Sequence, residues 1–154
     1  KQAFDDERAT RWLASYRAWL SDLIEKRPGG KASVPHYVIG LYGLVERFRN
    51  TIEAITKETW KTLSKQLPED LADDERIAME SRISISLRQD FLAAIEMETE
   101  AFAREILLSR PEAAEKLVES VRSLEKATGL LRLNMRAEAM LESFLLQSLR
   151  IWSS

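Results

Sequence analysis

The sequence predicts an all-α protein, an antiparallel bundle of about five helices with a long central helix. Apolar residues recur at steps of three and four along most of the chain, which is the spacing of one buried helical face. Glycine and proline, which interrupt helices, number only five and four among 154 residues. Charged residues make up 31% of the chain and suit the outer faces of amphipathic helices. We expect one helical-bundle domain over residues 1–154.

The first predicted helix runs from about Phe4 to Lys26. A Pro-Gly-Gly turn at residues 28–30 is expected to end it, because proline removes a backbone donor and glycine allows positive φ. The apolar residues of this helix form one buried stripe: Trp12, Leu13, Tyr16, Trp19, Leu20, Leu23 and Ile24.

The second predicted helix, residues 34–60, has the most regular apolar pattern of the chain. Steps of four and three alternate without interruption from residue 34 to residue 55, so we expect this helix at the centre of the bundle. Gly40 and Gly43 each cost about 1 kcal/mol relative to alanine inside a helix, which suggests that another helix approaches closely there. The same stripe supplies the predicted interface with a second copy or a partner protein: Leu41, Val45, Phe48 and Ile52.

An acidic segment, residues 68–75, precedes the third predicted helix. Asp73 or Asp74 is expected to be the N-cap, and the carboxylates complement the positive end of the helix dipole. The helix extends to about Leu108, and its apolar residues share one side: Ile83, Leu87, Phe91, Ile95, Phe102 and Ile106.

The fourth and fifth helices are predicted from their capping residues. Ser109, followed three residues later by Glu112, has the pattern of a capping box that opens the fourth helix. Gly129 is expected to close that helix at its C′ position. Asn134 is expected to cap the last helix, whose apolar side reaches Ile151.

The residue types that most enzymes use are nearly absent. The chain has no cysteine, which excludes disulfides and thiolate zinc sites, and His36 is its single histidine. Ser33 stands three residues before His36, so the Glu-x-x-His pattern of carboxylate metal bundles is missing. We therefore predict no catalytic residue, no metal site and no cofactor.

Charge is unevenly distributed along the chain. Residues 1–66 carry 12 basic and 8 acidic side chains, and residues 67–154 carry 11 and 17. The basic half could face RNA or an acidic partner, or it could consist of ordinary solvated helix faces. The first residues lack the apolar segment of a signal peptide, and the longest uncharged stretch, 32–45, is too short to span a bilayer. These features predict a soluble cytoplasmic protein without a membrane partner.

The candidate binding residues lie on the second helix. Tyr42 precedes Glu46 by one turn, and the two are predicted to line a cleft between helices together with Arg49 and Asn50. Arg47 and Arg49 would offer a basic face to RNA. The alternative is structural, because Glu46 at the edge of the apolar stripe can pair with Arg49 or Asn50.

The four tryptophans are interpreted as packing or interface residues rather than as a base-stacking surface. Trp12 and Trp19 lie one heptad apart, and Trp60 extends the central stripe. Trp152, near the end of the last helix, is expected to be exposed.

Residues 42–48 read Tyr-Gly-Leu-Val-Glu-Arg-Phe, and residues 133–141 read Leu-Asn-Met-Arg-Ala-Glu-Ala-Met-Leu. The first stretch resembles the Tyr-x-x-x-Glu-x-Phe pattern of HEPN-superfamily proteins of the RiboL-PSP-HEPN and MAE-type groups. The second resembles their Asn-capped helix start. The resemblance implies an all-α bundle that dimerises through its central helices, often within prokaryotic toxin–antitoxin or anti-phage defence systems.

Active members of these groups cut RNA without metal through an Arg-x(4–6)-His motif, and this chain departs from that pattern. No arginine precedes His36 at the required distance, and the family motif lies on a helix beyond the Asn-capped one. The chain is therefore expected to be either a fragment lacking that helix or a binding-only relative.

Three hypotheses of function follow from the sequence. The first is a HEPN-like domain that acts by dimerisation and by RNA or protein binding, with no complete RNase motif. The second is a non-catalytic helical protein–protein interaction module or complex subunit unrelated to nucleic acid. The third is an enzyme whose acid–base chemistry uses Glu46 and Tyr42.

Overall fold

The structure is a computed structural model that describes residues 6–26, 34–131 and 136–153. The predicted all-α bundle is confirmed, and the described residues contain no strand. A single turn of 3-10 helix, η1, joins the third and fourth helices. The elements are α1 (Glu7–Lys26), α2 (Val34–Ser64), α3 (Asp73–Ser109), η1 (Pro111–Ala113), α4 (Ala114–Leu131) and α5 (Ala137–Ser153).

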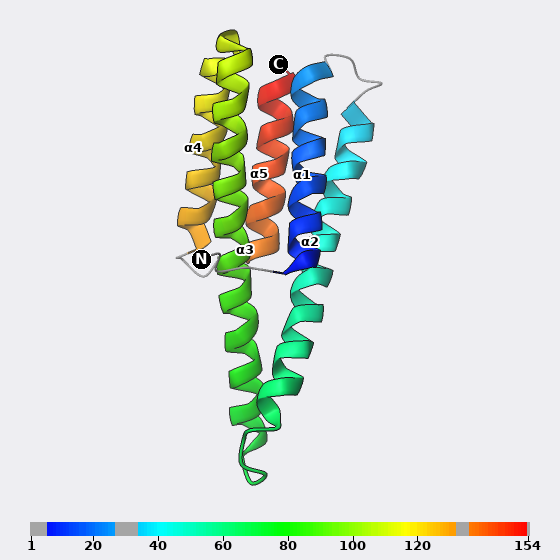
Figure 1. Ribbon diagram of the computed structural model, residues 1–154, viewed down its shortest axis with the longest axis vertical. Helices are drawn as coiled ribbons and strands as arrows, with labels where there is room; N and C mark the ends of the chain where they lie inside the picture. Colours follow the sequence, from blue (N-terminus) through cyan, green and yellow to red (C-terminus); the bar gives the residue numbers. More distant parts are fainter. Residues whose placement is uncertain (1–5, 27–33, 132–135, 154) are drawn as a thin grey trace.

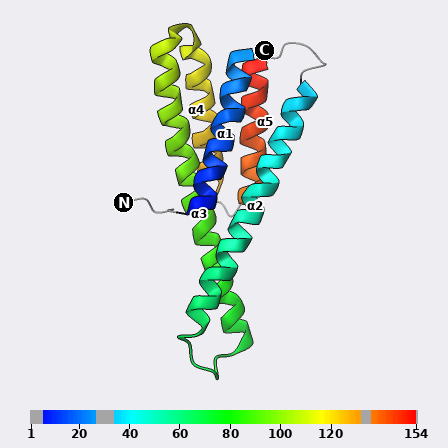
Figure 2. The same ribbon diagram turned by 45° about the vertical axis from the view of Figure 1, so that its right-hand side comes forward.

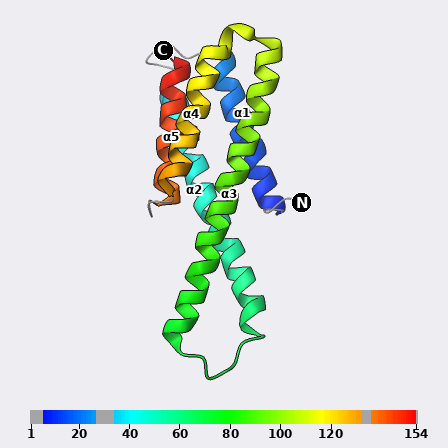
Figure 3. The same cartoon turned by 90° about the vertical axis from the view of Figure 1, so that its left-hand side faces the viewer.

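The molecule has two parts along its long axis (Figure 1). In the upper part all five helices run side by side, and α2 contacts α1, α3 and α5. In the lower part α2 and α3 continue alone to the connection between them. Figures 2 and 3 show the same projection from two further directions, so it is a pair of helices that leaves the bundle.

Aromatic rings from α1, α2 and α3 meet at the centre of the bundle. Trp12 stacks on Tyr16 with ring centroids 5.6 Å apart and meets the edge of Phe91 at 5.1 Å. Phe48 of α2 packs against Phe91 at 4.6 Å. The indole N–H of Trp12 donates to the carbonyl of Leu44 at 2.8 Å, so the polar atom of this buried ring is satisfied. These contacts hold α2 at the centre of the bundle, as its apolar pattern predicts.

Two helix ends differ from those predicted from capping residues. Ala72 is the N-cap of α3 and makes no side-chain cap hydrogen bond, whereas Asp73 and Asp74 lie inside the first turn. Their carboxylates still complement the helix dipole from that position. Ser109 is the last residue of α3, and its hydroxyl donates back to the carbonyl of Glu105 at 3.4 Å. The capping box does not form, because this hydroxyl is already satisfied within its own helix.

Gly129 does not end α4, which continues to Leu131. A C′ glycine is favoured because it adopts positive φ, and Gly129 instead keeps helical backbone geometry. The predicted turn at residues 28–30, the start at Phe4 and the cap at Asn134 lie outside the described residues.

The close helix approach predicted at the two glycines of α2 is present at one of them. A Cβ atom on Gly40 would lie 3.0 Å from Cδ1 of Trp19 on α1, so the indole ring occupies the space of the missing side chain. At Gly43 a Cβ atom would meet nothing within 4 Å. A side chain at Gly40 would therefore crowd the packing of α1 against α2, whereas one at Gly43 would not.

Trp152 is buried, contrary to the expectation that it would be exposed. Only 1% of its surface is accessible, because α5 stays helical to Ser153 and its last turn remains inside the bundle. The ammonium group of Lys116 on α4 lies 5.9 Å from the centre of the indole ring. Among the other tryptophans, Trp12 is buried, whereas Trp19 and Trp60 are half-buried.

The two-helix projection, residues 57–90, is called the arm below, and none of its residues is buried. The last buried residue of α2 is Thr56, and the first buried residue of α3 is Phe91. The arm nevertheless carries nine large apolar side chains, seven of them half-buried. The other two, Ile77 and Ile85, are exposed. The arm therefore has an apolar seam without a closed core.

Candidate functional site

The five predicted binding residues lie on two different sides of α2 and do not form one cleft. Tyr42, Glu46 and Arg49 share the side that faces α5. Arg47 and Asn50 share the side that faces α1, where both line a hollow. Helical spacing explains why Arg47 is separated, because positions 42, 46 and 49 fall on one face and position 47 is turned away from them. Asn50 follows Glu46 by four residues and Arg47 by three, so only its place in the hollow assigns it to the α1 side.

On the α5 side the predicted residues take part in surface interactions. The Tyr42 hydroxyl donates to Oε2 of Glu142 at 3.2 Å, and the nearby carboxylate charge raises the pKa of Tyr42. Glu46 forms an ion pair with Arg49 at 2.9 Å, the structural alternative predicted for it. Tyr42 and Glu46 are exposed and Arg49 is half-buried. An ion pair as exposed as Glu46–Arg49 contributes little to stability.

A stronger ion pair lies beside them and was missed by the sequence reasoning. Nε and Nη2 of Arg88 on α3 donate to the two carboxylate oxygens of Glu138 on α5, at 2.9 and 2.8 Å. The Arg88 side chain is 21% exposed and that of Glu138 is 14% exposed. The hydrogen bonds from Arg88 lower the pKa of the Glu138 carboxyl. No local pattern could reveal this pair, because its members are 50 residues apart and belong to different helices.

On the α1 side a hollow of about 300 Å³ lies between α1 and α2. Its lining combines arginines with an amide and an indole: Arg8, Arg11, Trp12, Arg47, Asn50, Thr51 and Ala54. Here two of the predicted binding residues, Arg47 and Asn50, come together with further basic side chains from another helix.

Two of the three arginines of the α1–α2 hollow are already neutralised. Arg8 binds Glu58 at 2.7 Å and also Asp6, and Arg11 pairs with Glu7 at 3.1 Å. The Arg47 guanidinium donates to the hydroxyl of Ser15 at 3.2 Å. Within the described part of the chain Arg47 forms no ion pair, so it is the cation of this hollow that remains open to an anion.

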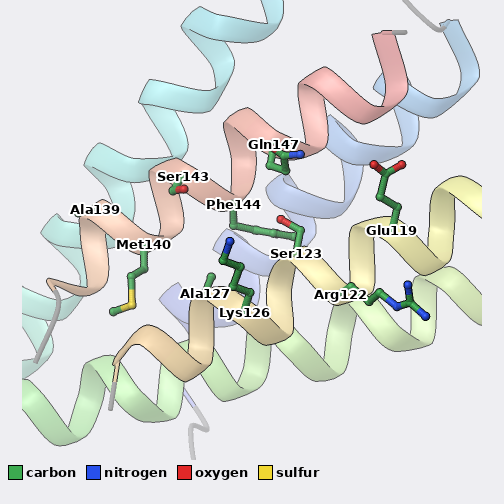
Figure 4. A pocket seen from close by; sticks show the side chains of 10 residues that line it. All are labelled: Glu119, Arg122, Ser123, Lys126, Ala127, Ala139, Met140, Ser143, Phe144 and Gln147. Carbon is green, nitrogen blue, oxygen red and sulfur yellow. The ribbon is translucent and has the colours of Figure 1, made fainter. Parts of the chain in front are cut away.

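A second hollow, of about 380 Å³, lies between α4 and α5 (Figure 4). Phe144 and Met140 of α5 provide its apolar floor, and Lys126 and Glu119 of α4 stand at its rim. The guanidinium of Arg122 points away from the hollow in this view. Opposite charges at the rim and an open shape give this groove no clear preference for one class of ligand.

The four residues predicted at a protein interface are in the interior of the chain. Leu41, Phe48 and Ile52 have no exposed surface, and Val45 is 6% exposed. Each packs into the core of its own bundle, so none is available to a partner in this structure. The expected interface through these residues is therefore corrected: their regular apolar spacing reports burial between α2 and its own neighbours.

Exposed apolar side chains that a partner could contact lie outside this stripe, and two of them are on the arm. Ile77 is 68% exposed and Ile85 is 55% exposed. They are eight residues apart on α3, which places them on the same side of the helix. Neither isoleucine was predicted at an interface, because both positions fall outside the regular apolar stripe of this helix.

Other candidate sites offer no chemistry that stands out. His36 is exposed at the start of α2, with its ring against that of Tyr37. Across residues 6–26, 34–131 and 136–153, no group of three or more histidine, aspartate or glutamate side chains is placed to hold a metal ion. Of the helices in these ranges, none combines the length and apolar character needed to cross a membrane.

No protein-family model, curated protein or solved structure matches the chain. Function is therefore inferred from the surfaces themselves.

Proposed function

We propose that this protein is a helical protein–protein interaction module that binds its partner through the arm. The observation that carries the proposal is that residues 57–90 contain nine large apolar side chains and no buried residue. Ordering two helices costs conformational entropy, and burial of apolar surface is the main term that offsets it. Seven of the nine are half-buried within the arm, whereas Ile77 and Ile85 stay exposed, and a partner would bury these two.

The rest of the molecule supplies a rigid base for the arm. Two ion pairs join the bundle to the arm helices near the point where they leave it. Arg8 of α1 binds Glu58 of α2 with two hydrogen bonds, and Glu138 of α5 binds Arg88 of α3. The largely covered Arg88–Glu138 pair fixes α3 at its base, which lowers the entropy lost when a partner binds, and the exposed Arg8–Glu58 pair adds a weaker contact to α2.

Site-specific photo-crosslinking tests this function. A photoreactive amino acid replaces Ile77 or Ile85 of the arm, and a matched control carries it at exposed Leu108 of the bundle. The chain is irradiated in the cells that encode it, and adducts are identified by mass. We expect discrete adducts from the two arm positions and none from residue 108. Irradiation that yields no adduct from either arm position would contradict the proposal.

RNA binding at the α1–α2 hollow is a second candidate function, favoured by one observation. The hollow brings Arg47 and Asn50 beside an indole ring, and Arg47 forms no ion pair among the described residues. Arginine and aromatic faces together suit single-stranded nucleic acid. This candidate agrees with the resemblance to the HEPN superfamily, in which the chain would be an RNA-binding member of a prokaryotic defence or toxin–antitoxin system.

A salt titration with a matched pair of arginine variants tests RNA binding. Binding of a labelled single-stranded RNA is followed by fluorescence anisotropy for the wild type, Arg47→Ala and Arg49→Ala. Arg47→Ala should weaken binding and reduce its salt dependence by about one phosphate contact, and Arg49→Ala, on the other side of α2, should not. Equal affinities for all three proteins would remove this candidate.

A further inference from the structure

One row of residues on the arm is symmetric about its centre, and all of its members except the half-buried Arg88 are exposed. Asp74, Ile77, Ser81, Ile85 and Arg88 follow steps of three, four, four and three along α3. Steps of this size keep all five positions on one side of the helix. The two isoleucines lie four residues from Ser81 in opposite directions. The acidic and the basic residue lie seven residues from it, also in opposite directions.

Such a pattern is self-complementary for two helices that run antiparallel. When a two-fold axis passes between two copies of Ser81, Ile77 of each copy lies opposite Ile85 of the other. Asp74 of each copy lies at the level of Arg88 of the other. A parallel pair would instead place Asp74 against Asp74 and Arg88 against Arg88. Charge therefore favours the antiparallel arrangement.

We infer that the arm associates with a second copy of this chain, with the two α3 helices antiparallel and crossing at Ser81. Ser81 and the neighbouring Ala78 are both exposed and small, which allows two helix axes to come close. Ile77 and Ile85 then lose their exposure against each other. The inference rests on the proposed function, since it names the partner of the same arm.

The charge distribution beyond this row supports the same pairing. Residues 69–75 at the tip of the arm contain five carboxylates and no basic residue. None of the five forms an ion pair within the part of the chain that the structure describes. In the antiparallel pair this acidic tip reaches the base of the other arm, where Arg88 and exposed Arg136 lie near the start of α5.

Arg88 keeps donors free for this contact although Glu138 already binds it. Nε and one N–H of Nη2 go to Glu138, and Nη1 donates to the hydroxyl of Ser84. A guanidinium has five N–H groups, so two remain for a carboxylate of the second copy. Asp74 is the carboxylate that the antiparallel arrangement brings to this level.

Cysteine cross-linking tests the inference sharply, because the wild-type chain contains no cysteine. Ser81→Cys should form a disulfide-linked dimer on mild oxidation, since the two-fold axis brings this position against its own copy. Ser86→Cys is the control, because this exposed serine is turned about 140° away from Ser81 around the helix. It should remain monomeric on a non-reducing gel.

A mixing experiment separates antiparallel from parallel pairing. In the antiparallel pair the two copies of residue 77 are about 12 Å apart along the helix axis, beyond the reach of a disulfide. Ile77→Cys alone and Ile85→Cys alone should therefore not cross-link, whereas a mixture of the two proteins should give a heterodimer. Self-linking of Ile77→Cys would overturn the antiparallel arrangement.

Sedimentation equilibrium of cysteine-free proteins completes the test. Ile77→Glu with Ile85→Glu should weaken self-association by more than about tenfold, because the pairing would then bury four carboxylates. Ile39→Glu, at an exposed position outside the arm, should leave it unchanged. A wild-type chain that stays monomeric, with a Ser81→Cys variant that does not cross-link, would overturn the inference. In that case, photo-crosslinked adducts to a different protein would still support the proposed interaction module. An absence of any adduct would contradict both the interaction module and the self-association.

Discussion

Arg88 and Glu138 form a two-pronged ion pair that joins the base of the arm to the first turn of α5. The two hydrogen bonds measure 2.9 and 2.8 Å, and both side chains are mostly covered. Glu138 also lies in the first turn of α5, where the helix dipole favours a carboxylate. This pair fixes the position at which α3 leaves the bundle, so it links the folded core to the surface proposed for binding.

Removal of the arginine from this pair should destabilise the protein. Arg88→Ala leaves the largely covered Glu138 carboxylate without its donors, and we expect a loss of about 1–3 kcal/mol in the free energy of unfolding, measured with urea. Arg11→Ala is the matched control, because its partner Glu7 is exposed. That change should cost no more than about 0.5 kcal/mol. A similar cost for both variants would contradict the importance given to the Arg88–Glu138 pair.

The same pair predicts how stability depends on pH. The folded-state pKa of Glu138 lies below its ordinary value of 4.5, because Arg88 donates to the ionised carboxyl. The stabilisation is therefore fully present above about pH 4.5 and is lost as pH falls through the folded-state pKa. We expect the difference in unfolding free energy between wild type and Arg88→Ala to shrink below pH 4.5. A difference that stays constant from pH 7 to pH 3 would contradict this assignment.

The two glycines of α2 should respond in opposite ways to substitution by alanine. Gly43→Ala should stabilise the protein by up to about 1 kcal/mol, because alanine favours the helix and a Cβ meets nothing there. At Gly40 the new Cβ would crowd the Trp19 ring, which is held by its N–H bond to the Tyr37 carbonyl at 3.1 Å. Gly40→Ala should therefore give no gain or a loss. Thermal unfolding of the two variants side by side measures the difference.

A buried hydroxyl pair links α1 to α3 and gives a further test. The hydroxyls of Tyr16 and Thr99 lie 2.7 Å apart, and burial raises the pKa of Tyr16. Thr99 also donates to the carbonyl of Ile95, so Tyr16→Phe should cost only about 1 kcal/mol. Thr99→Val leaves the Tyr16 hydroxyl buried without its partner and should cost more, about 1–3 kcal/mol. Urea unfolding that shows the reverse order would contradict this description of the pair.

Most of the fold could be predicted from the sequence, because burial within one helix leaves a periodic trace. The stripe on α2 correctly placed this helix at the centre, and Gly40 correctly marked a close approach. Capping residues were less informative. Ser109 and Gly129 both matched local patterns, yet the first lies within the end of α3 and the second inside α4. Tertiary packing decides where a helix ends when local preferences are weak.

The candidate surfaces were harder to predict, because they depend on contacts between distant residues. The five predicted binding residues lie on two sides of α2. Their spacing along one helix does not indicate which neighbouring helix each side chain faces. The apolar residues chosen for an interface, such as Leu41 and Phe48, are instead the core. Sequence periodicity cannot tell a stripe that faces the chain's own helices from one that faces a partner.

Hydrogen exchange as a function of protein concentration tests the central claim, that the arm is a docking element distinct from the folding core. In dilute solution the amides of residues 57–64 and 73–90 should exchange well before those of the buried stretches of α2 and α3. At high concentration the arm amides should become protected while the rest of the bundle stays unchanged. Arm amides that exchange only with global unfolding, at a rate independent of concentration, would contradict the claim.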